Sequence, residues 1–364
     1  MLILKVKENK NFNILIFSSV VFLIFFGLLN LYSVLRPTGD FILFYKQIVW
    51  DLSGLFIIIL FYILKESFIK RMILPLYIIS LILLIGVLFF GTRVGGAIRW
   101  FRLAGISFQP SELSKLSLIL ALAYIFTDRS FRGFLVSTIA TLIPVFLILK
   151  EPDLGIAILH VFIWAIMLLF SGISYKIITT VFGVLLGSIP VMYFFVLKDY
   201  QRERIISFLN PEKYFLSSSY NVIMSKNTIG SGGMFGRGFL VSPSVNGQFV
   251  PKFETDFIFS AVGEQFGFFG SLLVLLAFGV IIFEILRKVK DFKDNFWKLT
   301  SIGIISCFMF HVFENIGMNI GLLPVTGIPL PFLSYGGTST IIFSIMIGFL
   351  LKANALSNKT RKVI

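Results

Sequence analysis

Residues 249 to 270 read FVPKFETDFIFSAVGEQFGFFG, and this stretch joins a polar part of the chain to a long apolar run. It closes the polar segment 198–255 and opens an apolar helix that we expect over 256–286. Two acids, Asp256 and Glu264, lie at this junction. An acid is costly to keep charged where a hydrated loop enters an apolar helix, which favours a functional site. An acid at a helix start can also cap free backbone N–H groups, so position alone leaves both interpretations of Asp256 open.

The composition is typical of a membrane protein with many spans. Of the 364 residues, 57% are hydrophobic and 14% are charged, and the mean hydropathy is +0.94. A water-soluble fold cannot bury that much apolar surface. The formal net charge of +14 lies mostly in loops between apolar segments, so we expect membrane lipids and an anionic lipid-linked substrate as partners, and no nucleic acid. The single Cys307 excludes an intramolecular disulfide.

Apolar runs of about 20 residues, the length that crosses a bilayer, predict an all-α polytopic membrane protein with about ten transmembrane helices. The first run is interpreted as a retained span, because no small-residue cleavage site follows it. No low-complexity linker divides the chain, so residues 1–364 are predicted to form one domain. The expected helices are 13–35, 42–64, 72–91, 110–127, 132–149, 153–171, 174–197, 256–286, 297–322 and 331–352.

The distribution of positive charge predicts the orientation. Lys and Arg concentrate in the segments that share a side with the N-terminus, so the positive-inside rule places both termini in the cytoplasm. The large loop between the seventh and eighth helices, 198–255, then lies outside, together with 91–115, 150–153 and 322–338. If the membrane is a bacterial inner one, no nucleotide sugar is available on that face. A substrate would therefore have to arrive on a lipid carrier.

The loop after the third span, GTRVGGAIRWFRLAGISFQPSELSKL (91–116), combines basic residues with a helix start. Glu112 and Lys115 are three residues apart on one helix face, so a structural ion pair would explain both. The alternative is an anion site, in which Arg99 and Arg102 bind phosphate and the helix N-terminus adds its dipole. The sequence is compatible with either.

Three further polar segments each allow a structural and a functional interpretation. Lys150 to Asp153 form a solvated turn or the start of the next helix. The segment IGSGGMFGRGF (229–239) matches neither a Rossmann nor a Walker pattern, so it is a plain turn or a flexible loop that approaches a bulky substrate through its backbone. The segment GLLPVTGIPLPFLSYGGTST (321–340) is a tight turn between helices or the wall of a broken-helix cavity.

Four blocks, in this order, resemble the SEDS family of shape, elongation, division and sporulation proteins, which includes RodA, FtsW and SpoVE. They are GGAIRWFRLAGISFQPSELSKL (95–116), KEPDLG (150–155), TDFIFSAVGEQFGFFG (255–270) and NIGMNIGLLPVTGIPLPFLSYGGTS (315–339). The resemblance extends over about residues 14–355, and the last block is more similar to the rod-shape branch, RodA, than to the division branch. Thr338 stands where the family usually has serine and keeps the hydroxyl.

The resemblance implies an inner-membrane peptidoglycan glycosyltransferase that polymerises lipid II on the external face during cell elongation, usually with a class B penicillin-binding protein. It implies that Asp256 is the essential acid, which we expect to act as the general base in a single displacement of undecaprenyl diphosphate. A divalent cation, Mg²⁺ or Mn²⁺, on Asp256 or Glu112 would meet the charge of the leaving group. The other expected contacts to substrate or diphosphate are Arg99, Arg102, Glu112, Lys115, Arg202 and Arg204.

Two other functions stay open. Broken helices and buried polar residues also suit a lipid II flippase, although the distinctive charged residues lie near the external face and not along the full depth of the bilayer. A third possibility is a scaffold for a penicillin-binding protein, which would need no catalytic acid. Glu264 lies about two helical turns deeper than Asp256, and we expect it to make a structural polar contact inside the bundle.

Overall fold

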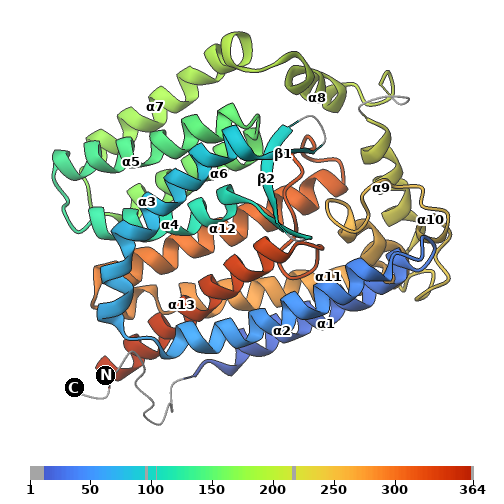
Figure 1. The fold of residues 1–364 in the computed structure, drawn as a ribbon, viewed down its shortest axis with the longest axis horizontal. Coiled ribbons are helices and arrows are strands. Elements are labelled where there is room, and N and C mark those ends of the chain that lie inside the picture. Colours follow the sequence, from blue (N-terminus) through green and yellow to red (C-terminus); the bar gives the residue numbers. More distant parts are fainter. Residues whose placement is uncertain (1–11, 95–96, 104, 215–218, 362–364) are drawn as a thin grey trace.

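Ten long helices form the body of the protein in the computed structural model, which describes residues 12–94, 97–103, 105–214 and 219–361. Each of them coincides with one of the expected spans, so the predicted all-α membrane architecture is confirmed (Figure 1). The helices are α1 (Ile14–Leu35), α2 (Phe41–Ile63), α3 (Glu66–Phe90), α4 (Pro110–Ile125), α5 (Phe131–Lys150), α6 (Leu154–Phe170), α7 (Tyr175–Val191), α11 (Ile258–Leu286), α12 (Asn295–Asn319) and α13 (Gly337–Arg361).

Helix ends differ from the expected ones where polar residues continue or interrupt a helix. Helix α3 begins at Glu66 and not at 72, because Glu66 and Lys70 form an ion pair of 2.7 Å across its first turn. Helix α13 begins only at Gly337, because the residues before it form an irregular turn. Within the described chain, eight helical segments are long and apolar enough to cross a membrane, whereas α4 and α6 have only 16 and 17 residues.

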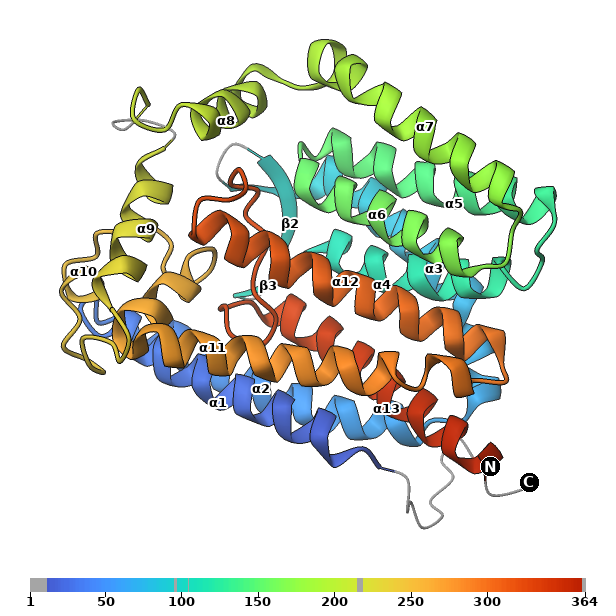
Figure 2. The same cartoon turned by 180° about the vertical axis from the view of Figure 1, so that it is seen from behind.

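Helices α12 and α13 form the centre of the bundle, and α7 lies at its edge. In the most apolar stretch of α12 and α13, 72% of residues are buried, against 22% in α2 and α3 and 6% in α7. Both views of the ribbon show α12 and α13 between the layer of α1, α2 and α11 and the layer of α3 to α6 (Figures 1 and 2). One π-helical turn, Met192–Val196, follows α7 and begins two residues after Pro190.

A small antiparallel sheet, which the sequence did not predict, covers one end of the bundle. Its strands are β1 (Thr92–Val94), β2 (Ala97–Leu103) and β3 (Ile106–Phe108), in the order β1-β2-β3. Gly105, with a φ of +79°, lies in the turn that pairs Leu103 with Ile106. Two of the strands have only three residues, so they contain too little alternation of polar and apolar side chains to be recognised.

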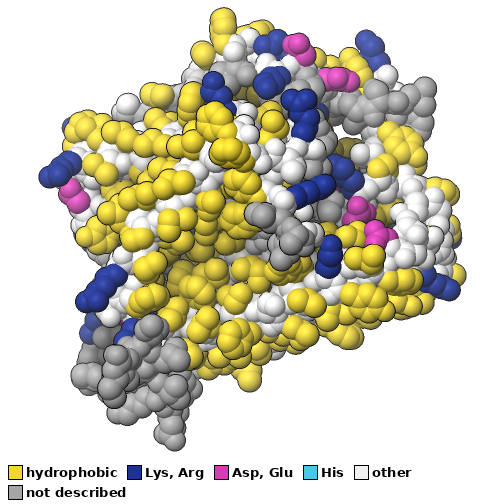
Figure 3. Space-filling model, in the orientation of Figure 1, with side chains coloured by type: hydrophobic (Ala, Val, Ile, Leu, Met, Phe, Trp, Pro, Cys, Tyr) yellow, Lys and Arg dark blue, Asp and Glu magenta, His cyan; other side chains and the backbone are white. Residues whose placement is uncertain are grey.

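The long segment between α7 and α11 lies at the same end as the sheet. It contains α8 (Asp199–Leu209), α9 (Tyr220–Ser231) and the short α10 (Pro243–Asn246), which confirms a partly helical loop. Figure 2 shows this loop opposite the end where α1 begins and α13 finishes. In Figure 3 hydrophobic side chains cover the helices of the bundle, while acidic and basic side chains gather mainly toward the two ends. This distribution suits a bilayer around the middle of the bundle.

The glycine-rich segment 229–239 packs against a break in α11. Gly267 has a φ of +65° inside that helix, and the freed backbone pairs with the segment: Phe268 N–H donates to Gly233 O (2.9 Å) and Arg237 N–H donates to Glu264 O (2.7 Å). A Cβ on Gly236 would lie 2.1 Å from Gln265 O. The glycines therefore form a turn at 232–235, as one of the two predictions had it, and permit the backbone of this turn to pack on the backbone of α11.

Candidate functional site

Asp256 lies in the turn before α11, and its main chain is held by two asparagines of α12. Asn315 and Asn319 each donate an Nδ2–H to the Asp256 carbonyl at 3.0 Å. Asn315 also donates to Ile328 O (2.9 Å), so the same side chain holds both the Asp256 turn and the turn after α12. The residue that caps α11 is Phe257, and no side chain caps this helix. The capping interpretation of Asp256 is therefore wrong, and its carboxylate faces the space beside the turn.

The Asp256 carboxylate is largely but not fully enclosed. Its side chain is 15% exposed, and Oδ2 lies 3.9 Å from Lys252 Nζ. Burial raises the pKa of Asp256 above its usual range, while Lys252, Arg204 and Arg99 act in the opposite direction. A carboxylate with a raised pKa and some access to solvent is suited to accept a proton from a bound hydroxyl group.

The turn after α12 approaches this carboxylate through glycine. Gly327 has a φ of +79°, and a Cβ there would lie 3.6 Å from Asp256 Oδ2. The neighbouring Thr326 hydroxyl donates a hydrogen bond to Glu314 Oε1 of α12. The proline-rich block predicted as a turn or a cavity wall thus forms one side of the candidate site.

The following residues of that block fix the backbone just before Asp256. The Ser334 hydroxyl donates to Thr255 O (2.6 Å), and Tyr335 N–H donates to Glu254 O (2.7 Å). Helix α2 supports this segment from the other side, because Gln47 Oε1 accepts from Gly336 N–H at 3.1 Å. Residues 334–336, which we call the clamp, therefore fix the main chain of Glu254 and Thr255, the two residues before Asp256.

Gln47 is itself held by polar groups that the sequence interpretation missed. Its Nε2 donates to Asp51 Oδ1 (2.9 Å) and to Thr340 Oγ1 (3.2 Å), and Gln47 and Asp51 are both buried. These two residues are four apart inside an otherwise apolar span, so they lie on one helix face. Polar residues at such a spacing in a membrane helix indicate a buried polar site, so the sequence already pointed to these two residues.

Arg99 connects the sheet to the turn between α5 and α6. Its Nε donates to Glu151 O (3.1 Å), its Nη2 donates to Pro152 O, and its Nη1 lies 3.3 Å from Asp153 Oδ2. Glu151 and Asp153 are buried, so a solvated turn at 150–153 is wrong. Arg99 pairs with the Asp153 carboxylate, whereas the buried Glu151 carboxylate has no hydrogen-bond partner among the described residues. Burial raises the pKa of Glu151 to about 9, aided by Asp153 and opposed by Arg99.

Arg102 belongs to the same strand but faces the other way. Residues three apart on a strand point to opposite faces, and Arg102, paired with Ser107, is exposed. Arg99 and Arg102 therefore do not share one side of the sheet.

Glu112 and Lys115 form the predicted ion pair at the start of α4. Their Oε2 and Nζ atoms lie 2.7 Å apart, and the two side chains are 2% and 0% exposed. Lys115 Nζ lies 3.0 Å from His311 Nε2 and 4.3 Å from the centre of the Phe343 ring. The Pro329 carbonyl can only accept from His311 Nδ1 (3.0 Å), so Nδ1 carries the hydrogen and Nε2 accepts from Lys115.

The two arginines of α8 have different partners. Arg202 donates from Nε to Tyr193 O (3.0 Å) and from Nη2 to Phe194 O (2.7 Å), and so it fastens the π-helical end of α7. Arg204 donates from Nη1 to Val325 O (3.0 Å), in the same turn that carries Gly327. Of these two, it is Arg204 that acts on the charge of Asp256.

Glu264 makes a structural contact, although with the loop between α7 and α11. Its Oε1 accepts from Ser244 N–H (3.0 Å) and its Oε2 accepts from Val245 N–H (3.1 Å), both at the start of α10. The side chain is 1% exposed. Glu264 therefore supplies the anchor that holds the loop on α11 and takes no part in the site around Asp256.

The predicted cation ligands, Asp256 and Glu112, do not lie in a cluster of acids. No group of three or more His, Cys, Asp or Glu side chains that could hold a metal occurs in the part of the chain that the structure describes. Glu112 is already paired with Lys115 inside the bundle. Glu112 therefore offers no free carboxylate to a cation, and Asp256 lies among cationic side chains; Mg²⁺ or Mn²⁺ stays a prediction.

Comparison with known proteins agrees with this architecture. A family model for cell cycle proteins of the FtsW, RodA and SpoVE type matches residues 12–359. The peptidoglycan glycosyltransferase MrdB of Escherichia coli is 37% identical over 279 residues, which is 75% of this chain and 75% of that protein. The peptidoglycan glycosyltransferase RodA of Treponema pallidum is 29% identical over 97% of this chain and 99% of that protein.

Solved structures are similar over nearly the whole chain. One comes from work on the structural coordination of polymerization and crosslinking by a peptidoglycan synthase complex; it has a TM-score of 0.82 at 29% identity and covers 96% of this chain and 99% of that one. The rod shape determining protein RodA of Thermus thermophilus has a TM-score of 0.71 at 27% identity, over 95% of this chain and 97% of that one. The fold described above is therefore shared with these proteins.

Proposed function

Because the chain belongs to the FtsW, RodA and SpoVE family and is a peptidoglycan glycosyltransferase, we propose that it polymerises lipid II during cell elongation with Asp256 as the general base. The observation that carries this assignment is the Asp256 carboxylate. It is partly exposed beside basic side chains, in a turn whose main chain is fixed by Asn315, Asn319 and the 334–336 clamp.

The reaction joins two sugars in a single displacement. The acceptor 4-hydroxyl loses its proton to Asp256 and attacks the anomeric carbon of the donor sugar. The new C–O bond forms as the bond to undecaprenyl diphosphate breaks, and the bonding electrons leave with the diphosphate. No covalent enzyme intermediate is needed, and the configuration at the anomeric carbon inverts. Three cationic side chains act electrostatically on the Asp256 carboxylate: Arg99, Arg204 and Lys252. They would stabilise the negative charge that develops on the departing diphosphate.

The sidedness of the reaction is part of the proposal. The sheet, the loop with α8 to α10 and the Asp256 turn lie at one end of the bundle, and the positive-inside rule assigns that end to the external face. A lipid-linked substrate reaches that face without a nucleotide donor. Since one similar solved structure belongs to a peptidoglycan synthase complex, we further propose that a class B penicillin-binding protein is the partner of this chain.

Purified full-length protein, with its penicillin-binding partner, and labelled lipid II in detergent test the assignment. We expect glycan polymer from the wild-type protein and none from Asp256→Ala protein that elutes as a monodisperse species. Polymer at the wild-type rate from Asp256→Ala protein would remove Asp256 from the mechanism. Because no membrane is crossed in detergent, polymer formation also separates this function from that of a flippase. Repeating the assay with EDTA and with added Mg²⁺ or Mn²⁺ tests the predicted cation.

A further inference from the structure

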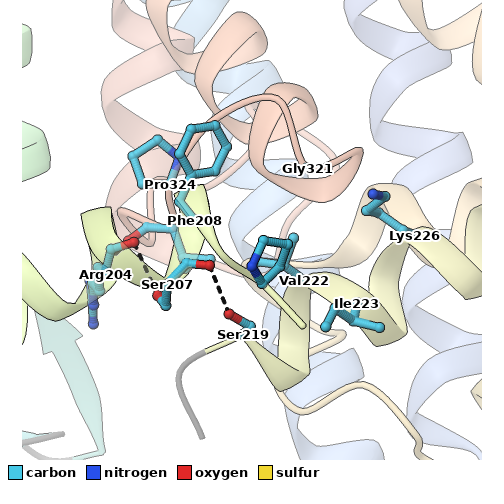
Figure 4. A pocket seen from close by; sticks show the side chains of 11 residues that line it. Arg204, Ser207, Phe208, Ser219, Val222, Ile223, Lys226, Gly321 and Pro324 are labelled. Carbon is cyan, nitrogen blue, oxygen red and sulfur yellow. Dashed lines mark hydrogen bonds between the residues drawn. The ribbon is translucent and has the colours of Figure 1, made fainter. Parts of the chain in front are cut away.

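We propose that a pocket between α8, α9 and the turn after α12 binds a carboxylate in the peptide part of the lipid II substrate. The proposal rests on the function proposed above and adds a specificity-determining site to it. The pocket is lined by two neighbouring helices of one loop, α8 and α9, and by the turn after α12, which is far from both in the sequence (Figure 4). The lining residues are Arg204, Ser207, Phe208, Pro211, Ser219, Val222, Ile223, Lys226, Gly321, Pro324 and Val325.

The size of the pocket limits what can enter it. Its volume is about 50 Å³. One water molecule needs roughly 10–15 Å³ of such a volume. A carboxylate with a neighbouring methyl group fits into that space, whereas a disaccharide does not. The pocket therefore suits an appendage of the substrate and not the sugars that react.

The lining selects the charge of the ligand. In Figure 4 Lys226 lies at one side of the group of side chains and Arg204 at the other, with the Arg204 guanidinium pointing away from them; none of the described lining residues is acidic. Between them lie apolar walls made by Phe208, Val222 and Pro324. A short peptide that presents a carboxylate to Lys226 also meets these apolar walls with its small side chains.

The aliphatic part of the Lys226 side chain packs against Gly321. A Cβ on Gly321 would lie 2.7 Å from Lys226 Cδ, so the lysine stem lies directly over this glycine. Gly321 also has a φ of +73°, which other residues adopt with strain. Lys226 is exposed, and within the described chain no ion pair to it occurs. Its ammonium group is therefore held at the pocket and is available to an anion.

The position of the pocket places the rest of the substrate near Asp256. Arg204 lines the pocket, donates to Val325 O and acts electrostatically on Asp256. Val325 is two residues from Gly327, which lies beside the Asp256 carboxylate. A peptide held in the pocket would thus keep its attached sugar next to the general base. The diphosphate, which is joined to the lipid, is a less suitable occupant because the pocket walls α8 and α9 belong to the external loop.

Two substrates and three variants test the proposal. Polymerisation by the full chain with its penicillin-binding partner would be measured with lipid II and with lipid II whose peptide carboxylates are amidated; both retain the diphosphate. We expect the wild-type protein to favour the free carboxylate about 10-fold in kcat/KM, the effect of one charge-assisted hydrogen bond. Lys226→Glu should abolish this preference and Lys226→Arg should keep it. Lys213→Glu, an exposed lysine of the same loop outside the pocket, should leave the preference unchanged.

The outcomes separate the pocket from the function on which it rests. A wild-type protein that uses both substrates equally, or a Lys226→Glu protein that keeps the wild-type ratio, overturns the proposal. An equal loss on both substrates also overturns it and indicates the diphosphate as the ligand. The glycosyltransferase assignment is judged separately, by polymer from the wild-type protein and its loss in Asp256→Ala.

Discussion

Asp256 combines catalytic value with a cost in stability. Burial raises its pKa above the value of 3.8 that an ordinary aspartate has, although Lys252, Arg204 and Arg99 limit the shift. The folded protein therefore binds this proton more tightly than the unfolded chain does. Between the two pKa values the free energy of unfolding decreases as the pH rises, so the charged acid destabilises the fold at neutral pH.

We therefore expect Asp256→Asn to abolish polymerisation and to stabilise the protein at pH 7. The amide keeps the shape of the side chain but removes the buried charge, and a gain of about 1 kcal/mol would raise Tm by about 2–4 °C. Thermal unfolding in detergent, followed by tryptophan fluorescence, measures this gain. The difference between the two proteins should vanish at a pH below 3.8, where the acid is protonated in both states. A lower Tm for Asp256→Asn at pH 7 would show that the charge is stabilised by its neighbours.

Gln47 is expected to act on catalysis without touching the substrate. Its Oε1 accepts from Gly336 N–H, in the clamp that holds Glu254 and Thr255. Gln47→Ala should lower kcat about 10-fold or more with little change in KM, because a small displacement of the base affects the transition state more than binding. Steady-state polymerisation rates over a range of lipid II concentrations measure this division.

The control for Gln47 lies on the same helix. Leu52→Ala changes a side chain that is 63% exposed on the outer face of α2 and should leave kcat unchanged. Asp51→Asn keeps an oxygen that can accept from Gln47 Nε2 and should retain most of the activity. A Gln47→Ala protein that changes KM alone would assign this residue to substrate binding and contradict a positioning role.

The break in α11 shows how one helix determines the path of a loop. Gly267→Ala should destabilise the protein, because its Cβ would lie 2.4 Å from Gly236 N and the φ of +65° is unfavourable for alanine. The conformational cost alone is about 1–2 kcal/mol. Gly279→Ala, in the same helix with no atom within 4 Å of the added Cβ, should be neutral or stabilising by up to about 1 kcal/mol. Thermal unfolding of the two variants side by side compares them, and equal Tm values would contradict the role of the break.

The elements that sequence predicts well are those with a long and repetitive signal. Twenty apolar residues in a row identify a span such as α1 without further context. By contrast, β1 has three residues, and its pairing with β2 depends on contacts that the sequence does not state. The break at Gly267 is hidden in the same way, because glycines are common in membrane helices and the neighbouring Gly263 and Gly270 do not break α11.

In the candidate site, too, some residues can be recognised from the sequence and others cannot. Asp256 stood out because it is an acid at the boundary between a polar loop and an apolar helix. The partners that hold it, Asn315, Asn319 and Ser334, act through its backbone and that of Thr255. Asn315 and Asn319, four apart in a membrane helix, are a signal of the same kind as Gln47 and Asp51, but residue type does not tell that their partner is the Asp256 main chain. The burial of Asp153 was missed for a related reason, since it depends on Arg99 from a distant strand.

The orientation of the whole molecule decides which substrates it can meet, and it can be measured by cysteine labelling. The single native Cys307 is fully buried, so the wild-type protein should not react with a membrane-impermeant maleimide. Lys213 lies in the loop with α8 and α9, and Lys293 lies between α11 and α12 at the opposite end; both are exposed. In intact spheroplasts we expect Lys213→Cys to be labelled at once, and Lys293→Cys only after the membrane is permeabilised. The reverse pattern would place Asp256 in the cytoplasm, where lipid II is still on the side of its synthesis, and would contradict an external polymerase.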